Sequence, residues 1–171
     1  MSLSMSSASL PVLQTMLNNL SHILAKGQAF AEARKIDPTA LLQYRMAPDM
    51  LPFTRQIQIA CDMSKLGVAR IAGVEAPKFD DNEASFADLR GRIQKTLDWL
   101  ATVPAAQIDG TEDKEITFPV GREATRTMKG EAYLKHWVLP NVFFHVTTAY
   151  LILRHNGVEL GKADYLAGAQ A

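Results

Sequence analysis

The chain is poor in three features that often reveal a protein's class: cysteine, excess charge of one sign, and long apolar runs. Its only cysteine, Cys61, excludes an intrachain disulfide, and the surrounding apolar stretch 57–61 predicts a small buried hydrophobe rather than a reactive thiol. Eighteen basic residues balance eighteen acidic ones, so no net field favours nucleic acid or an anionic membrane as partner. No segment approaches the roughly 20 apolar residues that span a bilayer.

What is present is typical of an ordinary globular protein. The 171 residues are 47% hydrophobic and 21% charged, which favours one domain with a substantial core. The first nine residues contain no basic residue and no long apolar run, so we expect no signal peptide and a cytoplasmic location. We expect residues 1–8 to be disordered and residues 9–171 to form the domain.

Helical periodicity dominates the sequence. Apolar residues recur at three-and-four spacing in four segments, near residues 9–34, 51–72, 83–102 and 140–155. The ends carry matching signals: Ser9 is a plausible N-cap, Gly73 a natural stop, and Asn156-Gly157 a C-terminal cap. A short helix is predicted to start at Asp37-Pro38.

Residues 107–129 differ from the rest of the chain. Lys114–Phe118 alternates polar and apolar residues as a strand does, and we expect a minor hairpin over residues 114–127. The fold class is therefore all-α: an antiparallel four-helix bundle with a small β-hairpin insertion before the last long helix. The length of that insertion suggests a crossover connection at this point, and we expect the tail after Val158 to fold back over the bundle.

Helical bundles place their sites in the core, on polar side chains of facing helices. Five residues meet this description: His22 on the first helix, Gln58 and Asp62 at i and i+4 on the second, and His145 and Tyr150 on the last. His145 is the strongest, because its helix is apolar nearly all round and a buried imidazole needs a partner for each nitrogen. Each residue also has a purely structural interpretation. Motifs for zinc proteases, di-iron bundles, phosphate-binding loops and serine hydrolases are absent.

Three segments carry a family resemblance: Arg45–Met50 (RMAPDM), Gln56–Asp62 (QIQIACD) and the long run Leu139–Asp164. They closely resemble an uncharacterised bacterial family catalogued as domain of unknown function 1993, over nearly the whole chain from about Leu10 to Leu166. That family resembles the DinB/YfiT-like superfamily of four-helix bundles.

The resemblance implies several properties. Many superfamily members bind a divalent metal through three histidines, one on the second helix and a His-x-x-x-His pair on the last. Characterised relatives include thiol-dependent transferases and isomerases, and dimers are common. In this chain His145 matches one half of the pair, but Ala149 stands in place of the other, and the second helix offers Gln58 and Asp62 instead of a histidine.

Two hypotheses follow. The favoured one is a metal-free, small-molecule-binding or stress-associated dimeric protein, because Ala149 cannot be a ligand. The alternative is an enzyme of the thiol-transferase or isomerase type, with a divalent metal such as zinc or nickel held by Asp62 and His145. We also expect a homodimer, and His145 facing the second long helix near Gln58 or Asp62.

Overall fold

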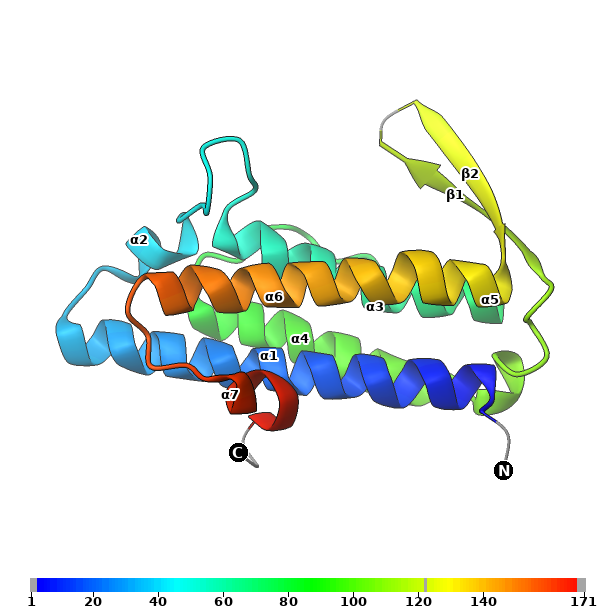
Figure 1. The fold of residues 1–171 in the computed structure, drawn as a ribbon, viewed down its shortest axis with the longest axis horizontal. Coiled ribbons are helices and arrows are strands. Elements are labelled where there is room, and N and C mark those ends of the chain that lie inside the picture. Colours follow the sequence, from blue (N-terminus) through cyan, green and yellow to red (C-terminus); the bar gives the residue numbers. More distant parts are fainter. Residues whose placement is uncertain (1–2, 122, 169–171) are drawn as a thin grey trace.

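The protein is mainly helical, and its four long helices lie side by side (Figure 1). The computed structural model describes residues 3–121 and 123–168. The long helices are α1 (Met5–Arg34), α3 (Phe53–Ala72), α4 (Phe86–Thr102) and α6 (Leu139–His155). The shorter elements are α2 (Pro38–Leu42), η1 (Ala105–Gln107), β1 (Glu115–Val120), β2 (Ala124–Lys129), α5 (Gly130–Tyr133), η2 (Leu134–Val138) and α7 (Lys162–Ala167). The predicted helical fold with one small hairpin is confirmed.

The directions of the helices differ from the antiparallel arrangement that we expected. The rings of Phe53 and Phe86, the first residues of α3 and α4, lie 5.9 Å apart, so these two helices run in parallel. The crossover is therefore residues 73–85, and not the segment before α6. An extended residue spans about 3.3 Å and a helical one about 1.5 Å, so a connection of this length can return along the whole of α3.

Helix α1 begins at Met5, earlier than the predicted start at Ser9. The side chain of Ser4 accepts a hydrogen bond from the backbone of Ser7 and caps the helix, and both the backbone N–H and the hydroxyl of Ser6 bond to Asp109. These contacts order residues that we expected to be disordered up to position 8. Residues 1 and 2 lie outside the described part of the chain.

Close packing between helices depends on small residues. A Cβ atom on Gly67 of α3 would lie 2.6 Å from Val138, and one on Gly27 of α1 would lie 2.8 Å from Leu153 of α6. Cys61 is fully buried beside α4, as predicted, and this burial raises the pKa of its thiol to about 12. A thiol with such a pKa is protonated at neutral pH and serves as core packing.

The hairpin extends from one end of the helices (Figure 1). Ile116 and Phe118 of β1 are buried, and the ring of Phe118 packs on Tyr133 and Trp137 at centroid distances of 4.7 and 5.0 Å. None of the described helices is long and apolar enough to cross a membrane. The C-terminal segment returns over α1 through α7, as expected, and its last three residues are outside the described part.

Candidate functional site

His145 lies inside the protein, in the seam between α3 and α6. His145 is 9% exposed and Gln56 is 1% exposed. The Nδ1 atom of His145 lies 2.7 Å from the Oε1 atom of Gln56. The amide of Gln56 is oriented by a second bond, because its Nε2 atom donates to the carbonyl oxygen of Leu51 at 2.9 Å. Since Oε1 can only accept, Nδ1 of His145 carries the proton. The Gln56 side chain therefore fixes the tautomer of the imidazole.

The other ring nitrogen of His145 is left with its lone pair. Within residues 3–121 and 123–168 no group hydrogen-bonds Nε2, and the atom is not sealed from solvent. Burial lowers the pKa of His145 from 6.5 to about 4, so the ring is neutral at physiological pH. The ring of Phe144, a residue 56% exposed, stands edge-on to it at 5.1 Å. His145 thus presents a neutral, fixed hydrogen-bond acceptor beside an exposed aromatic ring.

The residues present do not fit a divalent metal held by Asp62 and His145. Asp62 follows Gln56 by six positions, which is about 240° around the helix, so it faces α4 rather than α6. Ala149, one turn after His145, is fully buried and offers no donor atom. The part of the chain that the structure describes contains no group of three His, Cys, Asp or Glu residues placed to hold a metal ion. Among the described residues, the two proposed ligands therefore have separate partners, Arg92 and Lys65 for Asp62 and Gln56 for His145.

Asp62 belongs instead to a buried ionic cluster around Arg92 of α4. The Oδ1 atom of Asp62 accepts hydrogen bonds from Nη2 of Arg92 at 2.8 Å and from Nζ of Lys65 at 2.7 Å. The Arg92 side chain is only 2% exposed, and its Nη1 atom also pairs with Glu83 at 2.9 Å and Asp81 at 3.0 Å. Burial of the guanidinium lowers its pKa, but the carboxylates of Glu83 and Asp62 outweigh this and raise it. Arg92 remains charged.

Gln58 is part of the same cluster. Its Nε2 atom donates to Glu83 at 2.7 Å, and its Oε1 atom accepts from Arg55 at 2.6 Å; Arg55 in turn pairs with Asp81. Because Asp81 and Glu83 belong to the crossover segment, these bonds fasten residues 73–85 to α3 and α4. We therefore assign a structural role to Gln58 and Asp62.

His22 and Tyr150 lie elsewhere, around α7. The Nε2 atom of His22 and the Nζ atom of Lys26 are both 2.9 Å from Oδ1 of Asp164. The ring of Tyr150 packs edge-on against Tyr165 at 6.2 Å. Burial raises the pKa of the Asp164 carboxyl, but hydrogen bonds from Gly161, Lys26 and His22 outweigh this effect. The net result is a pKa lowered from 3.8 to about 2. The five residues predicted to share one pocket thus occupy three separate places.

Comparison with known proteins gives the family. The profile described as "Domain of unknown function (DUF1993)" matches residues 5–166. The chain belongs to the DUF1993 family. A solved structure described as a DinB family member protein from Shewanella denitrificans superposes on it with a TM-score of 0.86 and 41% identity, covering 95% of this chain and 91% of that chain. No curated protein matches. The family resemblance and the DinB-like fold expected from sequence are confirmed.

In this DUF1993 chain, sequence reasoning missed the partner of His145. A usable signal exists: Gln56 lies one turn before Ala60, the first of the buried small residues Ala60, Ser64 and Gly67 of α3. Gly67 packs closely on Val138, the residue just before α6, and a polar residue on the same side of α3 is expected to face the neighbouring helix. The Arg92 cluster was missed because two of its acidic members, Asp81 and Glu83, come from a connection that has no periodicity of its own.

Proposed function

We propose that this protein is a metal-independent binding protein in which Nε2 of His145 accepts a hydrogen bond from a small molecule. The fixed tautomer of His145 is the observation that carries the proposal, because Gln56 directs the proton to Nδ1 and leaves Nε2 available. A single hydrogen bond between a ligand donor and Nε2 contributes about 0.5–1.5 kcal/mol, so this bond alone gives the ligand only modest affinity. The neighbouring Phe144 ring supplies an apolar contact.

The ligand chemistry follows from these two groups. A neutral imidazole nitrogen selects a molecule with an O–H, N–H or S–H donor, and the exposed ring of Phe144 favours an apolar or aromatic body beside that donor. Small thiols, phenols and alcohols are the simplest molecules of this kind. A carboxylate or phosphate is disfavoured, because the neutral ring presents no charge and its lone pair repels an anion.

One observation favours the alternative, a divalent-metal enzyme of the transferase or isomerase type. Histidines that bind metals usually donate their other ring N–H to an oxygen, as His145 does to Gln56. Against it stand the buried Ala149 and the engagement of Asp62 with Arg92 and Lys65. A ligand set with a single imidazole binds zinc or nickel far more weakly than three imidazoles do.

Nuclear magnetic resonance of protein labelled with ¹⁵N-histidine tests the proposal. We expect the His145 ring to show a protonated Nδ1 and an unprotonated Nε2, and the Nε2 resonance to shift when small thiols, phenols or alcohols are added. In the same samples, zinc and nickel should not bind in a manner that depends on His145. A proton on Nε2, or tight zinc binding that the His145→Asn substitution abolishes, would refute the proposal and favour the metal enzyme.

The role of Gln56 has its own test. Gln56→Glu places a carboxylate next to Nδ1, so the pKa of His145 should rise by at least about one unit. Gln56→Met removes the acceptor, and the two tautomers of His145 should then coexist. Both results are read from the pH titration of the ring resonances. If neither substitution changes the titration or the tautomer, Gln56 does not orient His145.

A further inference from the structure

Two hollows lie beside α7, the short helix that packs across α1 (Figure 1). The first has a volume of about 570 Å³ and lies between α1, α6 and α7, and the second, of about 520 Å³, lies between α1, α4 and α7. Thr15 and Leu166 line both, so the hollows adjoin each other along α1. Neither His145 nor Gln56 belongs to the lining of either hollow. The hollows are therefore separate from the seam between α3 and α6.

The hollow between α1, α6 and α7, which we call the apolar hollow, is lined mainly by hydrophobic groups. Apart from Thr15, its lining consists of the side chains of Pro11, Val12, Met16, Phe143, Tyr165 and Leu166. Phe143 and Leu166 are 36% and 58% exposed, so much of this apolar surface is in contact with water. Covering it is favourable because apolar groups then leave water, and a pocket of this size and lining is typical of small-molecule sites. The apolar hollow therefore suits the hydrophobic part of a ligand.

The hollow between α1, α4 and α7, which we call the polar hollow, has a different lining. Its polar side chains are those of Thr15, Asn18, Asn19, Ser21, His22 and Arg90. Within residues 3–121 and 123–168, the side-chain hydrogen bonds of this lining are those that Asn19 and His22 make to α7. Asn18, Ser21 and Arg90 therefore keep their donors for a ligand, and Arg90 adds a permanent positive charge.

The acidic groups near Arg90 are engaged elsewhere. The stretch 5–25 of α1 contains no Asp or Glu. Asp164 of α7 accepts hydrogen bonds from Lys26 and His22, and Asp88 of α4 accepts one from the backbone at the start of its own helix. No ion pair among the described residues includes Arg90. The guanidinium is thus free to attract an anionic group into the polar hollow.

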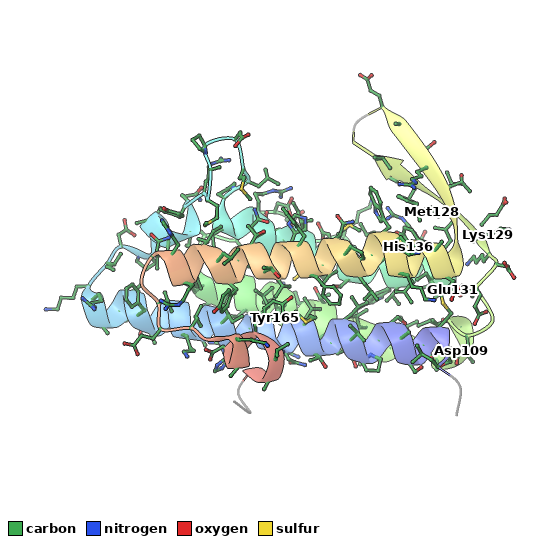
Figure 2. All side chains as sticks on the ribbon, viewed as in Figure 1. Asp109, Met128, Lys129, Glu131, His136 and Tyr165 are labelled. Atoms are coloured by element: carbon green, nitrogen blue, oxygen red, sulfur yellow. The ribbon has the colours of Figure 1, made fainter. Side chains whose placement is uncertain are left out.

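The wall that α7 contributes to both hollows is already in place. The Nδ2 atom of Asn19 donates to the carbonyl oxygen of Tyr165 at 2.8 Å, and Thr147 of α6 donates to the hydroxyl of Tyr165 at 3.2 Å (Figure 2 shows Tyr165 next to α1 and α6). Asp164 also accepts from the backbone N–H of Gly161 at 2.7 Å, which fastens the start of α7. A ligand therefore loses little free energy to ordering this helix, as in most small-molecule sites.

We propose that the two hollows form one site for a small molecule with an apolar body and a single carboxylate. The apolar body lies against Phe143 and Leu166, and the carboxylate pairs with the guanidinium of Arg90, whose fork of N–H donors matches its two oxygens. Val12 in the apolar hollow and His22 in the polar one are ten positions apart on α1, which is about 15 Å at 1.5 Å per residue. A saturated fatty acid such as decanoate has a suitable length. The proposal does not depend on the His145 site.

Isothermal titration calorimetry of the full chain with decanoate tests this site. We expect one molecule to bind per chain, and decanol, which has the same body without the charge, to bind at least about tenfold more weakly. Arg90→Gln should weaken decanoate by about tenfold and leave decanol unchanged. Phe143→Ser should weaken both molecules by about tenfold, because both use the apolar hollow.

Three matched variants serve as controls and should bind decanoate as the parent does. Lys95→Gln removes an exposed charge from α4 beside a different hollow. Lys162→Gln removes a charge from α7, where Lys162 lines a smaller hollow of about 170 Å³ that shares only Tyr165 with the apolar one. Met46→Ser removes an apolar side chain that is 38% exposed, about as much as Phe143, in the loop before α3.

The outcomes separate clearly. Arg90 is exposed, so Arg90→Gln decides the matter if Phe143→Ser fails to fold by circular dichroism. Decanoate that does not bind at millimolar concentration overturns the proposal, and so does the binding of several molecules per chain, which indicates adsorption. Equal weakening by Lys162→Gln and Arg90→Gln overturns the pairing of the carboxylate with Arg90. Loss of decanoate binding in His145→Asn also overturns the proposal, because the ligand then lies in the seam between α3 and α6.

Discussion

Protonation of His145 should couple the stability of this protein to pH. The pKa of His145 is about 4 in the folded protein because the ring is buried, and about 6.5 when the chain is unfolded. Between these values the unfolded chain binds a proton that the folded protein does not. The free energy of unfolding therefore rises with pH in this window and falls as the solution is acidified from pH 6.5 towards 4.

The size of the effect follows from the shift. One pKa unit corresponds to about 1.36 kcal/mol, so 2.5 units give a loss of about 3 kcal/mol when acidification is complete. About 2 kcal/mol of this should appear between pH 7 and pH 5, where carboxylates remain ionised. Asp164, whose pKa is lowered to about 2, contributes its loss of stability only below about pH 4.

The comparison uses His145→Asn. The side-chain amide of asparagine can donate to Gln56 as Nδ1 does, but it does not ionise. Urea denaturation followed by circular dichroism should show the free energy of unfolding falling more steeply with acid in the parent than in the variant, by about 2 kcal/mol between pH 7 and 5. The same comparison with His155→Asn, at an exposed histidine, controls for loss of any imidazole. Equal slopes in the parent and His145→Asn would refute the assignment of His145 as a buried neutral base.

Two further pairs of substitutions probe the packing of α3 and α4. Gly67→Ala forces a methyl group to within 2.6 Å of Val138, so it should lower the free energy of unfolding by about 1–3 kcal/mol. Gly91→Ala meets open space, so it should raise the free energy of unfolding by up to about 1 kcal/mol. Equal melting temperatures for the two variants would contradict the contact between Gly67 and Val138. Arg92→Ala leaves Asp62 and Glu83 without their buried partner, so it should lower the free energy of unfolding by about 3 kcal/mol. Arg90 is exposed on the same helix, and Arg90→Ala should change the free energy of unfolding by less than about 0.5 kcal/mol. Similar melts for the two arginine variants would show that the cluster does not stabilise the fold.

The helices could be predicted from the sequence because each is a local pattern. The boundaries of α3, α4 and α6 lie within three residues of the predicted ones, and the stops at Gly73 and Asn156 are confirmed. The start of α1 was wrong because its stabilising contact is to Asp109, more than a hundred residues away. The parallel direction of α4 could not be predicted either, since periodicity looks the same in both directions along a helix.

The candidate site shows where such patterns stop being informative. That His145 is buried in the fold follows from the apolar residues around it, and the structure places it there. Its partner was misassigned because α3 is buried over a wide arc, against α6 on one side and against α4 and the crossover on the other. Gln56, Gln58 and Asp62 differ by about 100° of rotation per residue around one helix axis. Which of them faces α6 depends on the rotation of α3, which is set by packing rather than by its own sequence.

The two polar sites of α3 have opposite electrostatic character, and this difference has a physical basis. The pair of His145 and Gln56 in the seam with α6 is neutral, so its burial requires only that the hydrogen bonds be made. The cluster of Arg92, Asp62 and Glu83 beside the crossover is charged, and its burial is tolerated because opposite charges meet within 3 Å. Charge is thus concentrated in α3 and α4 where it fastens a connection without regular structure, whereas the buried polar pair between α3 and α6 carries none.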